Sequence, residues 1–264
     1  MSAVNTLNTL NTFNTFQQRS TAVPPVHHRQ IESKEQHMGP QMSNTSWDVY
    51  REIHKAMRFA LFGVTARAGA TAADYDAGVA ALLREWDDVC LVLLGHHGHE
   101  DDFCDALIET HAPQLRGELE ESHLMADGVI ARLRASAGRI AASPSGDRWS
   151  LLRSFYLDLA DFTGQYIDHL RFEEDVVMPA LNAAMTNAEL EAVTNMIRGS
   201  VPPPEMCVFI RYMVPSMNFS ERLDMLGGMH AGAPPDVFEM FRAAAQAALP
   251  SNEYRAVAEA AGFV

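Results

Sequence analysis

The stretch YIDHLRFEEDVVMPAL, residues 166–181, decides how we interpret this chain. His169 and Glu173 are four residues apart in it, so on a helix they lie one above the other on a single face. At helical spacing the other positions on that face are apolar: Phe155, Leu159, Phe162, Tyr166, Val176 and Ala180. A glutamate buried in such a face is costly without a cation partner, and a bound metal ion would supply that partner.

A second helix, predicted over about residues 71–111, repeats this pattern. Its inward face is expected to contain Leu82, Trp86, Val89, Leu93, His96, Glu100, Phe103 and Leu107. His97 and Asp101 form another pair with the same spacing, rotated along the helix surface, so spacing alone leaves the register open. We favour His96 with Glu100 because the apolar positions share their side of the helix.

Two further helices each place one histidine among apolar neighbours. The first, from Trp47 to about Thr65 with cap residues in Ser43–Ser46, carries His54 between Tyr50, Met57, Leu61 and Val64. The third, over about residues 115–139, carries His123 between Leu119, Ala126, Ile130 and Leu133.

The turn sequence AASPSGD, residues 141–147, separates the third helix from the fourth, which is predicted from Arg148 to about Met185 with a kink near Pro179. No stretch alternates apolar and polar residues with a period of two between hairpin turns. We therefore predict an all-α protein whose four long helices form an up-and-down bundle.

Mid-helix positions of such a bundle meet in one layer, which would bring four histidines and two glutamates together. These residues are His54, His96, Glu100, His123, His169 and Glu173. Six ligands suit more than one metal ion, and two glutamates can bridge two ions. Imidazole and carboxylate ligands fit Fe, Mn or Zn, whereas the three cysteines show no CxxC spacing for a thiolate zinc site or a disulfide framework.

These residues resemble the hemerythrin-like, or HHE cation-binding, domain family. The resemblance rests on His54, on HHGHED in the second helix, on His123, and on HLRFEE followed by MPAL in the fourth, and it covers roughly residues 47–185. It implies a four-helix bundle with a non-heme di-iron centre bridged by Glu100 and Glu173. The resemblance places the histidine ligands at His54, His96, His123 and His169.

The chain departs from the oxygen carriers of this family in its third helix. Those proteins have a second histidine one turn after the first, and here Asp127 occupies that position. Either one iron has fewer nitrogen ligands or Asp127 binds it. Tyr166, one turn before His169, either donates a hydrogen bond near the site or is a core aromatic residue.

Three functions remain open from the sequence. The leading hypothesis is a di-iron protein that binds or senses dioxygen or a related small oxidant. A di-iron enzyme that consumes peroxide or acts as an oxidase is the alternative, favoured by Asp127 in place of a histidine. The third is a metal-free helical interaction module whose buried histidines are satisfied by hydrogen bonds.

After residue 185 the sequence changes to short helices separated by Gly and Pro, so we expect a bundle over 45–185 and a helical extension over 186–264. Thr186 and Glu189 form a capping box, and PPP at 202–204, Ser220, Pro235 and Ser251 mark further helix starts. This region is rich in methionine, which favours core packing and also suits a surface for a protein partner.

Residues 1–44 begin with the polar repeat NTLNTLNTFNTF and are predicted to be disordered, although MSNTSWDVY reads like an ordinary N-terminus starting at Met42. The net charge of −14 disfavours a nucleic-acid partner. A run of about twenty apolar residues, which a membrane span needs, does not occur, and the N-terminus lacks a cationic segment followed by an apolar one. We expect a cytoplasmic protein that does not enter the membrane.

Overall fold

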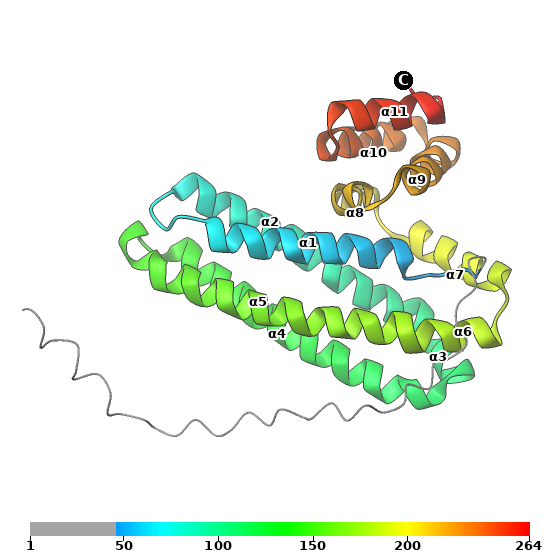
Figure 1. Cartoon of the computed structure of the whole chain (residues 1–264), viewed down its shortest axis with the longest axis horizontal. Coiled ribbons are helices and arrows are strands. Elements are labelled where there is room, and N and C mark those ends of the chain that lie inside the picture. The colour runs from blue at the N-terminus through cyan, green and yellow to red at the C-terminus, as the bar shows by residue number, and fades with distance from the viewer. Residues whose placement is uncertain (1–45) are drawn as a thin grey trace, which may run out of the picture. The chain divides into compact units, whose positions relative to one another are not determined.

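The computed structural model describes residues 46–264, and within that range it contains helices and no strand. Its four long helices are α1 (Arg51–Ala70), α2 (Asp76–His99), α4 (Arg116–Ala142) and α5 (Arg148–Phe172). Each packs against the next in the chain, and α5 packs back against α1, which closes the bundle (Figure 1). The all-α up-and-down bundle is confirmed, while the predictions for residues 1–44 lie outside the described residues.

The segment before α1 is held by side chains rather than by helical hydrogen bonds. The carboxylate of Asp48 accepts the backbone N–H groups of Tyr50 and Arg51 at 3.0 and 3.1 Å, so the helix begins at Arg51. The predicted start at Trp47 is therefore wrong, and of the cap residues expected in Ser43–Ser46 all but Ser46 lie outside the described residues. Trp47 instead donates its indole N–H to Thr194 of α7 (Asn187–Ser200) at 2.9 Å.

Each of the two glutamate-bearing helices is interrupted by a single π-helical turn that begins at the glutamate. These turns are η1 (Glu100–Cys104), followed by α3 (Asp105–His111), and η4 (Glu173–Val177), followed by α6 (Met178–Ala184). The carbonyl of Glu100 accepts the N–H of Asp105, and that of Glu173 accepts the N–H of Met178, five residues onward in both cases. Such turns are rare and frequent at functional sites.

The predicted second and fourth helices are therefore not continuous rods. The second also begins at Asp76 rather than near Thr71. Pro179 lies in the first turn of α6, after the π turn is complete, so the irregularity in the fourth helix precedes the proline that was expected to cause it.

The extra residue in each π turn shifts the buried face by one position. After Glu100 the buried side chains are Cys104 and Ile108, whereas the predicted Phe103 and Leu107 are only partly buried. The same shift occurs after Glu173. There Val177 and Leu181 are buried, with 0% and 1% exposure, whereas the predicted Val176 is 39% exposed.

This register can be tested with two neighbouring valines. We expect Val177→Ala to lower the free energy of unfolding by about 2 kcal/mol, because it removes buried methyl groups and leaves a cavity. Val176→Ala should change it by less than about 0.5 kcal/mol, as is usual for exposed positions. Urea denaturation of both metal-free variants measures the difference, and equal effects would contradict the shifted register.

The C-terminal extension consists of α7, α8 (Pro203–Ser216), α9 (Phe219–Gly232), α10 (Pro235–Ala248) and α11 (Ser251–Ala261). The predicted capping box of Thr186 and Glu189 is present, and the start expected near Ser220 is capped instead by Asn218 with Glu221. The division of the chain at residues 185 and 186 stays a prediction.

The extension packs on the bundle through both apolar and charged side chains. Phe209 and Ile210 of α8 are buried in the same core as Met57 of α1. Lys55 of α1 donates to both carboxylate oxygens of Glu221 at 2.6 and 2.8 Å. Among residues 46–264, no helix combines the length and apolar character needed to cross a membrane.

Candidate metal centre

Four imidazoles, one from each long helix, converge on two carboxylates in the interior of the bundle. The six side chains are those of His54, His96, Glu100, His123, His169 and Glu173, and each is buried. They come together because each histidine lies on the inward face of its helix and at the same end of the antiparallel bundle. His54 and His123 lie near the starts of α1 and α4, and His96 and His169 lie in the last turns of α2 and α5. The six residues singled out from the sequence are thus neighbours in space.

Glu173 lies at the centre of this cluster, with 0% exposure. Its Oε2 atom lies 3.2 Å from Nε2 of His54 and 3.9 Å from Nε2 of His96. Its Oε1 atom lies 3.1 Å from Nε2 of His169 and 3.6 Å from Nε2 of His123. Each carboxylate oxygen therefore faces a different pair of imidazoles.

Glu100 connects the same two pairs from another side. Its Oε2 atom lies 3.3 Å from Nε2 of His96 and 3.2 Å from Nε2 of His123. The carboxylate of Asp101 is largely exposed, and its closest cluster contact is with Nδ1 of His123 at 3.9 Å. Glu100 rather than Asp101 is therefore the carboxylate that the second helix directs into the cluster.

The polar atoms at the centre of the cluster lack hydrogen bonds. The Nε2 atoms of His54, His96, His123 and His169, Oε2 of Glu100 and both carboxylate oxygens of Glu173 are buried without a hydrogen-bond partner. Native proteins rarely leave buried polar atoms unsatisfied, and seven together require an explanation. A cation between them would satisfy them, and imidazole nitrogens with carboxylate oxygens form a donor set that suits iron, manganese or zinc.

Comparison with models of protein families matches residues 45–181 to the Hemerythrin HHE cation binding domain. The chain belongs to this family. The whole cluster lies inside the matched residues, which confirms the family resemblance. Comparisons with curated proteins and with solved structures gave no match.

Two of the histidines of this HHE domain are oriented by outer contacts. Nδ1 of His54 lies 2.9 Å from a carboxylate oxygen of Glu174, which also accepts two hydrogen bonds from Arg58 at 2.6 and 2.8 Å. Nδ1 of His169 lies 2.8 Å from the hydroxyl of Ser122. Such contacts fix which ring nitrogen faces a metal ion. Helical spacing did not reveal these contacts, although Glu174 and Ser122 are adjacent in the chain to Glu173 and His123.

His97 occupies the edge of the HHE cluster. Its Nε2 atom lies 2.8 Å from the hydroxyl of Tyr166, and its Nδ1 atom lies 2.8 Å from the carboxylate of Asp127. Its ring also stacks on that of His123, with centroids 4.4 Å apart. His97 therefore contacts the neighbouring helices α4 and α5, and it also lies close enough to His123 and His169 to share an ion with them.

These contacts show where two residues lie that the sequence left open. Asp127 is directed toward His97 and is not among the groups of side chains close enough together to hold an ion. Tyr166 is a buried core residue, and its hydroxyl is also hydrogen-bonded to His97 beside the cluster.

The carboxylates set the charge of the metal-free cluster. Burial lowers the pKa of His54, but Glu173 and Glu174 outweigh burial and raise it to about 9. Burial also lowers the pKa of His123, but Glu100 and Glu173 outweigh burial and raise it to about 10. Both imidazoles are therefore protonated at neutral pH when no metal is bound.

The two glutamates and His97 respond differently to their surroundings. Burial raises the pKa of Glu173, yet the surrounding imidazoles outweigh burial and hold that pKa well below its usual range. Burial and the charge of Glu173 raise the pKa of Glu100. Burial, assisted by the neighbouring imidazoles, lowers the pKa of His97 to about 2, so this ring is neutral.

Proposed function

We propose that this HHE domain holds two iron ions and binds or senses dioxygen or a related small oxidant. The observation that carries the proposal is the position of Glu173, whose two oxygens each face a separate pair of imidazoles. One ion would be held by His54 and His96, the other by His123 and His169, with Glu100 and Glu173 bridging them. When bound, an iron pair supplies reversible oxidation and reduction together with an open position for a small ligand.

The protein's own residues would prepare this site in two ways. Glu174 lies against Nδ1 of His54 and Ser122 lies against Nδ1 of His169, so the Nε2 atom of each ring faces the cluster. The apolar bundle around the cluster keeps bulk water away from it. We propose that His97 and Asp127 lie outside the ligand set, because both ring nitrogens of His97 already have partners.

Metal analysis tests this function. Protein purified from iron-supplied cells is expected to contain about two iron ions per chain, as a donor set with two bridging carboxylates allows. A visible charge-transfer band should appear after aeration, and samples reconstituted with manganese or zinc alone serve as controls for the band. Zero or one iron per chain without that band would contradict the di-iron proposal. An unchanged melting temperature after exhaustive chelation would favour the metal-free interaction module.

A peroxide-consuming or oxidase-like enzyme is the second candidate, and one chain of contacts favours it. Tyr166, His97 and Asp127 form a hydrogen-bonded series that ends at a carboxylate that is 47% exposed. The inner part of the series lies against the cluster, because the ring of His97 stacks on that of His123 and the ring of Tyr166 contacts that of His169. Such a series can deliver protons to a buried site, which peroxide cleavage requires. Steady peroxide turnover that falls in Asp127→Asn at unchanged iron content would support the enzyme. Stoichiometric, reversible dioxygen uptake without turnover would support the carrier or sensor.

We also propose that the protein acts in the cytoplasm and without a nucleic-acid partner. Cys90, Cys104 and Cys207 are all free thiols, which suits a reducing compartment. The net charge of −14 opposes binding to phosphate backbones. A protein partner would bind the C-terminal extension, where Met196 and Met240 are exposed.

Metal loading is expected to release protons. His54 and His123, with pKa values raised to about 9 and about 10, are charged at pH 7 without metal, and an imidazole must be neutral to bind an ion. Anaerobic Fe²⁺ titration at pH 7 should therefore release about two protons from these rings per filled cluster. The apparent affinity should rise as pH increases toward 9 to 10. A pH indicator in weakly buffered solution measures the release, and binding without it would contradict these charges.

A further inference from the structure

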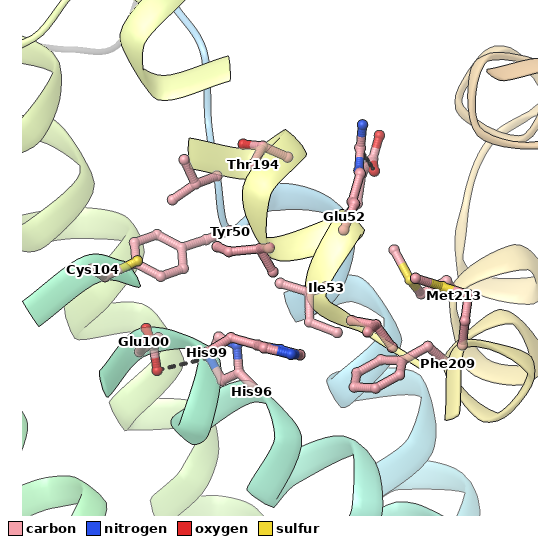
Figure 2. Close-up of a pocket in the computed structure, with 15 residues that line it drawn as sticks. Tyr50, Glu52, Ile53, His96, His99, Glu100, Cys104, Thr194, Phe209 and Met213 are labelled. Carbon is pink, nitrogen blue, oxygen red and sulfur yellow. Dashed lines mark hydrogen bonds and ion pairs between the residues drawn. The ribbon is translucent and has the colours of Figure 1, made fainter. Parts of the chain in front are cut away.

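The C-terminal extension forms one wall of a pocket whose inner end is at the candidate metal centre. Figure 2 shows His96 and Glu100 on one side of this pocket and Phe209 and Met213 of α8 on the other. We call it the extension pocket. Its apolar lining consists of Val49, Tyr50, Ile53, Cys104, Ile197, Val201, Met206, Phe209 and Met213. Its volume is about 90 Å³.

Thr194, Glu52 and Arg198, which lie around the outer part of the pocket, already have polar partners. Thr194 accepts a hydrogen bond from the indole of Trp47 and donates one to the carbonyl of Leu190. Glu52 is paired with Arg198 at 2.7 Å. A charged or strongly polar occupant would lose its hydration without gaining new hydrogen bonds from these three residues. His99 is the other polar residue of this wall, and its ring lies against that of Phe209 with centroids 6.2 Å apart.

The inner end is different, because its polar atoms are buried and have no hydrogen-bond partner. They include Oε2 of Glu100, Nε2 of His96 and the hydroxyl of Tyr50. Tyr50 is 2% exposed, and its ring stacks on that of His54 at a centroid distance of 4.8 Å. An occupant of the extension pocket would therefore lie beside the cluster, against a carboxylate that repels anions.

We propose that the extension pocket binds a small uncharged apolar molecule, such as a short hydrocarbon, directly beside Glu100. A volume of about 90 Å³ is several times what one water molecule needs, which is about 10–15 Å³ on this measure, so the pocket has room for an occupant of several non-hydrogen atoms. Apolar walls with few polar groups are typical of sites for such ligands. This inference goes beyond the proposed function. Binding in the extension pocket requires that α7 and α8 pack on the bundle, and it does not require a metal ion.

Xenon is a suitable probe, because it enters dry apolar cavities. Crystals pressurised with xenon, and ¹²⁹Xe NMR in solution, are expected to show one saturable site between Glu100 and Phe209 in both metal-free and iron-loaded protein. Acetate, a small anion, should not compete for that site. Absence of xenon from the pocket, or displacement of xenon by acetate, would overturn the proposal.

Two partly buried valines provide matched variants. Val201→Phe adds a ring to the wall of the pocket and should weaken xenon binding by at least about tenfold, within the range seen when a hydrophobic pocket changes by small groups. Val237→Phe makes the same change on α10, which does not line the pocket, and should leave binding unchanged. If Val201→Phe fails to fold, Met213→Phe replaces it. Equal effects at 201 and 237 would overturn the proposal.

The outcomes also separate this proposal from the proposed function. Xenon binding in protein that never takes up iron would support the pocket proposal and contradict the proposed di-iron centre. Two iron ions in protein that binds no xenon would support the di-iron centre and contradict the pocket proposal.

Discussion

Replacing Glu173 by glutamine is expected to abolish binding of both metal ions. The oxygens of this carboxylate face the pair His54 and His96 and the pair His123 and His169, so one substitution affects both halves of the centre. Loss of an outer-shell partner alone costs about 10-fold to 100-fold in metal affinity, and loss of a shared charged ligand should cost more. Iron retained after gel filtration, measured by metal analysis, should fall to background.

Asp175→Asn is the matched control for this experiment. It removes a carboxylate two residues away that is exposed and absent from the cluster, so iron content should not change. Circular dichroism of the metal-free Glu173→Gln variant should show that the helices persist. Retention of half of the iron would mean that Glu173 serves only one ion, and full retention would exclude it as a ligand.

Replacing His96 by alanine is expected to deplete iron, whereas His97→Ala should retain it. Nε2 of His96 lies 3.3 Å from Oε2 of Glu100 and has no hydrogen bond, so it is available to an ion. Nε2 of His97 is instead held by the hydroxyl of Tyr166. Removal of His97 should lower metal affinity only as an outer-shell change does, by about 10-fold to 100-fold, which saturating iron overcomes.

Metal analysis at saturating iron, after removal of unbound ions, distinguishes the two variants. The reverse result, with iron lost only in His97→Ala, would assign the ligand role to His97 and put the bridging role of Glu100 in doubt. Loss in both variants would place a fifth imidazole on the ion held by His123 and His169. Asp127→Asn then tests whether the orientation of His97 matters for that role.

The bundle and the convergence of its histidines could be predicted because α-helical spacing is regular. His54, His96, His123 and His169 each lie in line with apolar residues at helical spacing, and the constant rotation per residue places them on the same inward face as those residues. The assumption of the same regularity explains why the buried positions predicted after Glu100 and Glu173 were wrong by one residue. A π turn changes the rotation per residue, and the compositions of EDDFC and EEDVV do not indicate that these segments form π turns.

Contacts between helices were harder to predict than contacts along one helix. The pairing of Arg58 with Glu174, and of Asp127 with His97, depends on the rotation of each helix about its own axis. Local periodicity also does not reveal where short helices dock, so the packing of Phe209 on the bundle, and with it the extension pocket, could not be foreseen.

The two π turns also determine where this chain can change in length. Deleting one residue inside a regular α-helix rotates everything after it by about 100° and exposes the inward face. Deleting Asp102, within η1, would instead turn the π turn into an ordinary helical turn, with Ile108 still facing inward and His96 undisturbed. Related chains should therefore differ from this one by single-residue gaps just after each glutamate, where a shorter helix still closes the same bundle.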